Sequence, residues 1–317
     1  MGYYSLLALL TLATYLAVVC AAAVCVHLVW PRSQEVLAQM PPRSRARTLF
    51  LLRGIPTICG GAAAIAAVTG FMEYEPAWTA ERPGVLLIAA ATAALGLIAL
   101  VPVRAVRALE QVIGCSRLIR QCAQVARNGQ AVCVVESAYP VAAVTGLFTA
   151  RVVVSDSLLR ECAADEIDVI LAHEAAHVNR ADNVVRALML ALPDPLRLLT
   201  SGPDIESAWA ATVEEAADDD AAGETVERRV VLASALVRVA ALARMPPPSW
   251  MPALAFFQGE NLERRVRRLL EPKTAAVSSL RVIEPAALAL IALLVTWGAF
   301  QGAALHDVME WAIRSLP

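Results

Sequence analysis

Four long stretches of the sequence contain no charged residue, and this feature most constrains how the chain can fold. They cover residues 2–31, 54–72, 83–103 and 285–306. Each is close to or above the ~20 residues that a helix needs to cross the core of a bilayer. The first lacks the basic start of a cleaved signal peptide and is longer than such a peptide's apolar segment. We therefore predict a mainly α-helical, multi-pass membrane protein with four transmembrane helices.

The arginines between these stretches predict the orientation. Five arginines and one glutamate lie within residues 32–53, whereas residues 73–82 hold three glutamates and one arginine. Arginine-rich loops stay in the cytoplasm. We therefore expect the N-terminus outside the cell. The predicted domains are 1–103 with three transmembrane helices (about 3–30, 54–72 and 83–103), a cytosolic domain over 104–284, and 285–317 with the fourth helix and a short external tail.

Composition disfavours several other classes of protein. The net charge of −2 offers no basic face for nucleic acid. The 7 cysteines follow no CxxC spacing, which argues against a disulfide framework and against a cysteine-rich zinc site. A transporter is disfavoured because the apolar stretches lack the intramembrane charges that transport requires.

The cytosolic domain alternates between helical patterns and short valine-rich strands. Apolar residues at helical spacing over 103–127 predict a helix that continues out of the membrane. Residues 130–137 and 150–159 predict strands, with a loop between them. Helices are expected over 164–192, 205–222, 227–243 and 259–270. Asp165 is the expected cap of the first of them, and Pro193 and Pro195 end it.

The segment LAHEAAHVNRAD (171–182) carries the chemistry. His173 and His177 lie one turn apart on one helical face, with Glu174 beside the first. H-E-x-x-H on a helix can bind one zinc ion through both imidazoles, while the glutamate reaches water at the metal. The alternative is a pair of surface or core histidines. It is the weaker interpretation, because the chain spends two of only 4 histidines here.

A zinc hydrolase needs a third protein ligand. The other histidines, His27 and His306, belong to the membrane stretches, so the third ligand should be acidic. Its expected source is VEEAADDDAA (213–222), whose alanines predict close helix packing. The alternative is an acidic face exposed to solvent, as most charge runs are.

These features resemble the membrane metallopeptidases of the beta-lactam sensor-transducer (antirepressor) family, and more distantly the HtpX-like and CAAX-type membrane proteases of the gluzincin group. Segments 144–159, 177–183 and 261–270 also carry the resemblance. It implies a cytosolic gluzincin-like α+β zinc protease domain between the third and fourth transmembrane helices. The family has an extracellular sensor domain after its last helix. This chain ends soon after its fourth apolar stretch, so we expect a signal to arrive through the membrane helices, a short loop or a partner.

The family's E-x-x-[AC]-D motif matches Glu214 to Asp218. The match implies that Glu214 is the third zinc ligand and that Asp218 orients a ligand histidine. The competing register, Glu215 with Asp219, puts Asp218 where the family has a small residue.

We therefore expect a zinc metalloendopeptidase with one Zn²⁺ per chain. His173, His177 and Glu214 would hold the ion, and Glu174 would act as general base. The oxyanion donor stays open between Tyr139 and an arginine of 264–268. An extended substrate is expected to add to an edge strand formed by Val152, Val153 and Val154.

The resemblance suggests a cytosolic protein substrate of the regulatory or repressor type. It also suggests a location in the lipid bilayer of the cell membrane, with a membrane sensor partner or a homo-oligomer. The competing function is a zinc-binding membrane relay or scaffold without proteolysis. Replacing Glu174 by glutamine would leave the output of such a relay intact.

Overall fold

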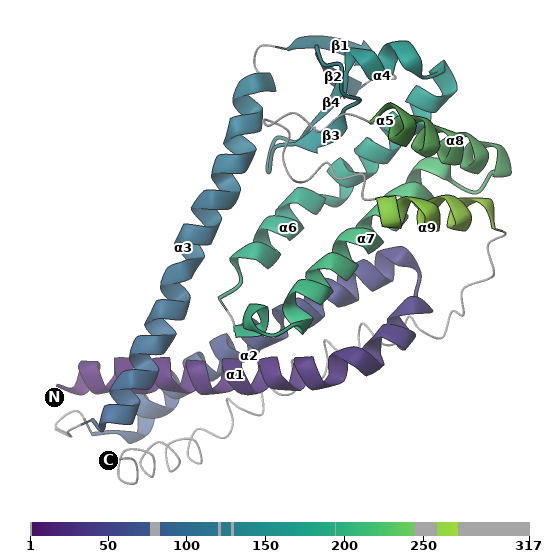
Figure 1. Cartoon of the computed structure of the whole chain (residues 1–317). Helices are drawn as coiled ribbons and strands as arrows, with labels where there is room; N and C mark the ends of the chain where they lie inside the picture. The colour runs from purple at the N-terminus through teal and green to yellow at the C-terminus, as the bar shows by residue number, and fades with distance from the viewer. Residues whose placement is uncertain are drawn as a thin grey trace. The chain divides into compact units, whose positions relative to one another are not determined.

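The structure is a computed structural model that describes residues 2–76, 83–119, 122–127, 130–193, 195–243 and 259–271. These residues are mainly helical and include one four-stranded sheet (Figure 1). They form two compact units. The described residues of the first, here called the apolar unit, lie within 2–104 and 191–208. Those of the second, the sheet unit, lie within 105–190 and 209–271.

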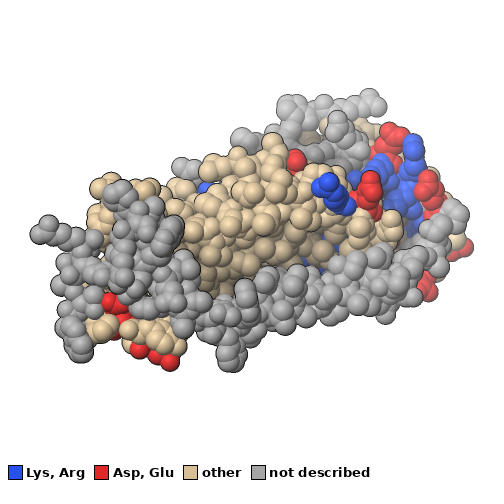
Figure 2. Space-filling model, turned by 90° about the horizontal axis from the view of Figure 1, so that it is seen from below, with Lys and Arg blue, Asp and Glu red and all other residues tan. Residues whose placement is uncertain are grey.

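The apolar unit contains α1 (Tyr3–Ala38), α2 (Pro42–Tyr74) and the first part of α3 (Val85–Ile119). All three helices have segments long and apolar enough to cross a membrane. Large apolar side chains such as Ile65 and Leu28 are exposed, as expected of a surface that faces lipid. Figure 2 shows a broad surface with few charged side chains, with acidic groups at one end and both acidic and basic groups at the other. Three of the four predicted spans thus coincide with helices, and the fourth lies outside the described residues.

The arginine-rich segment 32–53 is more helical than predicted. α1 continues to Ala38, and α2 starts at Pro42, a first-turn position that suits proline because its missing N–H needs no partner there. Arg53 is fully buried within α2, and its Nε lies 3.0 Å from Glu206 Oε1. The predicted loop is therefore reduced to a short connection between two helices.

The sheet comprises β1 (Ala123–Arg127), β2 (Gln130–Val135), β3 (Ala142–Thr145) and β4 (Arg151–Ser155), in the order β1-β2-β4-β3. β4 pairs in parallel with β2 and antiparallel with β3. The helix predicted over 103–127 is wrong at its end, because α3 stops at Ile119 and a strand follows. The loop predicted between the strands contains β3, which turns into β4 with Gly146 at a φ of 97°.

Val152, Val153 and Val154 do not form a sheet edge, and this prediction is wrong. Their strand, β4, has a neighbour on each side, and all three side chains are buried. A run of valines favours a strand but does not determine its place in the sheet. The edge strand on this side is β3.

The remaining helices follow the sheet in the chain. They are α4 (Asp156–Glu161), α5 (Ala164–Arg180), α6 (Asp182–Ala191), the 3₁₀ turn η1 (Pro195–Leu198), α7 (Ser201–Ala222), α8 (Val226–Leu242) and α9 (Gly259–Leu270). α5 packs against β3, β4 and α8. Their apolar faces form the main core, which includes Val152, Val154, Ile167, Leu232 and Leu236. The predictions for α8 and α9 are confirmed to within one residue, and α7 begins earlier than expected.

Candidate metal centre

Helix α5 supplies both histidines of the H-E-x-x-H motif. Ile167 and Leu171 bury its apolar face in the core. Packing of this face fixes the rotation of the helix about its axis. In this rotation His173 and Glu174 point inward, and their exposed fractions are 8% and 7%.

The first turn of α5 is anchored by a buried glutamate. The Glu166 carboxylate accepts a hydrogen bond from the Ala163 backbone N–H at 3.0 Å, which satisfies one of the free donors of a helix start. It also lies 2.8 Å from the Arg238 Nε of α8. Ala163 therefore occupies the cap position predicted for Asp165, which lies within the first turn.

The helix predicted over 164–192 is broken one turn after His177. Ala181 adopts a left-handed conformation with φ 53° and ψ 39°, and α6 starts at the next residue. This break brings Asp182 back onto His177, and its Oδ2 lies 2.7 Å from Nδ1 of the histidine. Sequence reasoning missed Asp182, because neither glycine nor proline marks the break.

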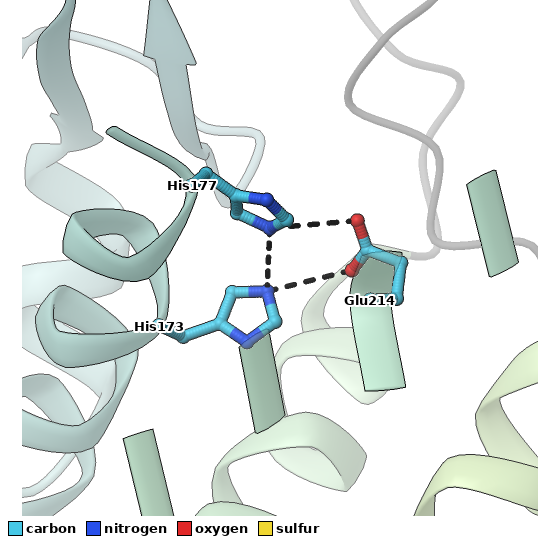
Figure 3. A group of neighbouring side chains, drawn as sticks. All are labelled: His173, His177 and Glu214. Carbon is cyan, nitrogen blue, oxygen red and sulfur yellow. Dashed lines mark hydrogen bonds and ion pairs between the residues drawn. The ribbon is translucent and has the colours of Figure 1, made fainter. Parts of the chain in front are cut away.

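Glu214 of α7 completes a group of three possible metal ligands with His173 and His177 (Figure 3). The two histidine Nε2 atoms are 3.1 Å apart. Glu214 Oε2 lies 3.4 Å from Nε2 of His173, and its Oε1 lies 3.5 Å from Nε2 of His177.

These three distances fit a tetrahedral zinc ion. Ligand atoms at ~2.0–2.1 Å from such an ion are separated by about 3.3 Å. The two imidazoles and the carboxylate of Glu214 therefore already stand at the corners of one tetrahedral face. Three protein ligands with a fourth position left to water are typical of catalytic rather than structural zinc sites.

Each histidine also has a carboxylate beside its other ring nitrogen. Asp182 occupies this place for His177, and Asp218 does so for His173, with 3.1 Å between Nδ1 and Oδ1. The Asp218 contact is close but not aligned as a hydrogen bond. A carboxylate at Nδ1 keeps the proton there and leaves Nε2 free to bind metal.

The carboxylates shift the pKa values of the centre. Burial by itself lowers the pKa of His173, but Asp218 and Glu214 outweigh it and raise that pKa to about 9. Burial raises the pKa of Glu174. Burial also favours a higher pKa for Glu214 and Asp218, but Arg265 and the histidines lower both. In the metal-free protein, His173 therefore carries a proton at neutral pH, and a metal ion would replace it.

The structure distinguishes the two alternatives for the acidic helix, Glu214 with Asp218 and Glu215 with Asp219. Glu214 and Asp218 face the histidines, whereas Glu215 Oε1 lies 3.0 Å from the Arg264 Nη2 of α9. Adjacent residues point about 100° apart around a helix, so only one register can face α5.

A cavity of about 130 Å³ lies beside the three possible ligands. Its polar wall includes Glu174 and Arg265, and its apolar wall comes from Trp209 and one face of α8. Among the described residues, Pro140 lines the cavity and Tyr139 does not. β3 contributes Ala142, Ala143 and Val144. The edge strand and the motif thus share one cavity.

Comparison with known proteins gave a match to part of the chain. Residues 77–194 match the family model of the BlaR1 peptidase M56. Comparisons with curated proteins and with solved structures gave no match. The M56 match contains His173, Glu174 and His177 and supports the resemblance seen in the sequence. It ends before α7, so Glu214 lies outside it and joins the histidines on geometry alone.

Proposed function

We propose that this protein is an integral membrane zinc endopeptidase that cleaves a cytosolic protein. The M56 match suggests a membrane metallopeptidase. One observation supports a zinc-dependent reaction. The Nε2 atoms of His173 and His177 and the carboxylate of Glu214 lie at the spacing of tetrahedral zinc ligands, and the buried Glu174 lines the same cavity.

His173, His177 and Glu214 would hold the ion. When bound, zinc acts as a Lewis acid that polarises the scissile carbonyl and lowers the pKa of water. Glu174 takes the proton of the attacking water as general base and returns it to the leaving amine. Its raised pKa brings it nearer to neutrality, where one group can both accept and donate a proton.

The edge strand β3 would bind the substrate chain. Val141, just before β3, and Ala143 within it turn their backbone groups towards β4, since the Ser155 N–H donates to Val141 O at 2.8 Å. The alternation of an antiparallel pair then turns the backbone groups of Ala142 and Val144 outward. Asn183 donates to Val144 O at 3.2 Å. An extended segment that paired with Ala142 would run along the cavity that His173, His177 and Glu214 line.

The proposed topology follows the arginine distribution. The sheet unit would lie in the cytoplasm and the N-terminus outside. Extracytoplasmic reporters fused within residues 77–82 should then be active, and the same reporters fused near Arg43 should not. The opposite pattern would require the substrate to be sought outside the cell.

The first experiment is the metal content of the purified full-length protein and two variants. About one zinc per chain is expected in the wild type. Glu214→Ala should lose it, and Glu215→Gln should keep it, because Glu215 pairs with Arg264 instead. Absence of metal from the wild-type protein after gentle purification would contradict the proposal.

Glu174→Gln separates the protease from the relay. It should retain zinc and lose peptide cleavage, because only the proton acceptor is removed. Comparing the N-termini of cellular proteins between wild type and this variant should reveal the substrate, for which we propose a regulatory or repressor-type protein. An intact biological output in the Glu174→Gln strain would favour the non-proteolytic relay.

A further inference from the structure

Helix α9 brings one arginine into the centre of the proposed zinc site. Arg265 is only 5% exposed, although it lies more than forty residues after Glu214 in the chain. Its Nη1 lies 2.9 Å from Glu214 Oε2. Its Nε and Nη2 donate to the two oxygens of Asp218 at 2.8 Å and 2.7 Å. The guanidinium of Arg265 therefore contacts both carboxylates that face His173.

The geometry suits a planar guanidinium and no other cation. A two-pronged contact to Asp218 fixes the plane of that carboxylate, while the third nitrogen remains for Glu214. Lysine has a single charged nitrogen and cannot make both contacts in fixed directions. Asp218 is fully buried, so the ion pair with Arg265 determines where its oxygens stand.

The charges in the cavity require such a cation. Glu174, Glu214 and Asp218 put three carboxylates around His173. Glu174 and Asp218 are buried, whereas the Glu214 side chain is 37% exposed. A buried carboxylate without a partner is unfavourable in its charged form. Arginine remains charged at every accessible pH, so Arg265 supplies a permanent counter-charge to Glu214 and Asp218.

Neighbouring contacts hold α9 in the rotation that turns Arg265 inward. Leu269 and Val266 pack into the main core. Arg264 binds Glu215 at 3.0 Å, and Arg268 binds Asp219 at 2.9 Å. The rotation of the helix is therefore fixed on both sides of Arg265.

From these contacts we infer that Arg265 is a positioning residue of the metal centre: it orients Glu214 as a ligand directly and His173 through Asp218. This inference rests on the proposed function, since it requires that the site binds zinc. It makes α9, a helix outside the family match, an integral part of the site.

The test measures metal binding by three variants of the full-length protein. Arg265→Met removes the charge and nearly keeps the volume, and Arg265→Lys keeps the charge. Arg267→Met is the matched control, because Arg267 lies on the same helix, is largely exposed and pairs with Glu263. Zinc affinity is measured by competition with a chromogenic chelator. The visible spectrum of the cobalt-substituted protein reports the ligand geometry.

Arg265→Met should bind zinc about 10–100-fold more weakly, the usual effect of removing a group that orients metal ligands. Its cobalt spectrum should change, Arg265→Lys should fall between it and the wild type, and Arg267→Met should match the wild type. Asp218→Asn should weaken zinc binding by a smaller factor in the Arg265→Met variant than in the wild type, because both residues act on His173.

Wild-type affinity and an unchanged cobalt spectrum in Arg265→Met would overturn the inference and leave the proposed function standing. An equal loss in Arg267→Met would also overturn it, because the effect would then belong to the whole helix. If Arg265→Met does not fold, an unchanged spectrum in Arg265→Lys decides against the inference. A wild type that binds no metal overturns the proposed function first.

Discussion

Asp182 and Asp218 each lie beside one of the two histidines, but they come from different parts of the chain. Asp182 follows His177 closely, whereas Asp218 reaches His173 from another helix. Asp182 forms a hydrogen bond with Nδ1 of His177, and Asp218 Oδ1 lies 3.1 Å from Nδ1 of His173, so both would act on a bound metal through a histidine. The loss of either one should weaken metal binding without removing a ligand.

Replacing Asp182 by alanine should lower zinc affinity about tenfold, because His177 would be free to rotate. Chelator competition measures the change. Asp220→Ala is the control, since Asp220 also binds Arg180, at 2.6 Å, and its loss disturbs the same arginine. Equal affinities for Asp182→Ala and the wild type would show that α5 alone holds the ring.

The raised pKa of His173 makes metal binding depend on pH. A histidine must be neutral to bind zinc, and in the metal-free protein this one loses its proton only near pH 9, as the pKa of about 9 requires. Zinc affinity should therefore rise about tenfold per pH unit between about pH 6 and 8 and level off above about pH 9. Calorimetry in buffers of different ionisation enthalpy should detect about one released proton. An affinity that stays flat over this range would contradict the pKa.

At the scale of elements, β3 is the strand on which proteolysis should depend. Ala142→Pro removes an outward-facing N–H, and an edge strand tolerates proline because that N–H has no partner in the sheet. We expect kcat/KM for a protein substrate to fall at least about tenfold while metal content stays at the wild-type level.

Val153→Pro is the comparison for this prediction. It lies in the interior strand β4, where proline breaks the sheet itself, so the variant should lose thermal stability. Unchanged cleavage by a folded Ala142→Pro variant would rule out β3 as the substrate strand.

At the scale of the whole molecule, the segment between α6 and α7 is held by α1 and α3, and the first part of α7 is held by α2. The Tyr15 hydroxyl donates to Pro193 O at 2.8 Å, and Arg104 donates to Leu192 O at 3.0 Å. Arg53 binds Glu206 at 3.0 Å. Polar contacts of this kind in an apolar surrounding hold a segment in place because the alternative is an unpaired polar group.

Glu206→Gln should destabilise the protein by about 3 kcal/mol, because it removes the negative charge that lies 3.0 Å from the buried Arg53. The double variant Arg53→Met with Glu206→Gln should recover part of this loss. Thermal unfolding in detergent measures both, with Glu73→Gln on the exposed face of α2 as control. Equal stability of Glu206→Gln and the wild type would mean that this ion pair does not hold the first part of α7 in place.

Several elements were predictable because their signals are local. The amphipathic pattern of α8 and α9 depends on residues within a few turns, and so does the face shared by His173 and His177. The break at Ala181 was not predictable, since alanine favours helix and rarely takes the left-handed φ of 53° that it has here. β1 and β3 were missed because strands are stabilised by partners distant in sequence.

By itself the sequence determined the apolar helices, the H-E-x-x-H motif and an acidic helix able to complete the site, because charge-free length and helical spacing are properties of short segments. Only the tertiary structure decided that Glu214 rather than Glu215 faces the histidines, that β3 is the sheet edge, and that Arg265 reaches Asp218. These are contacts between segments far apart in the chain. The packing of helix faces and the order of strands set them, and no local pattern encodes either.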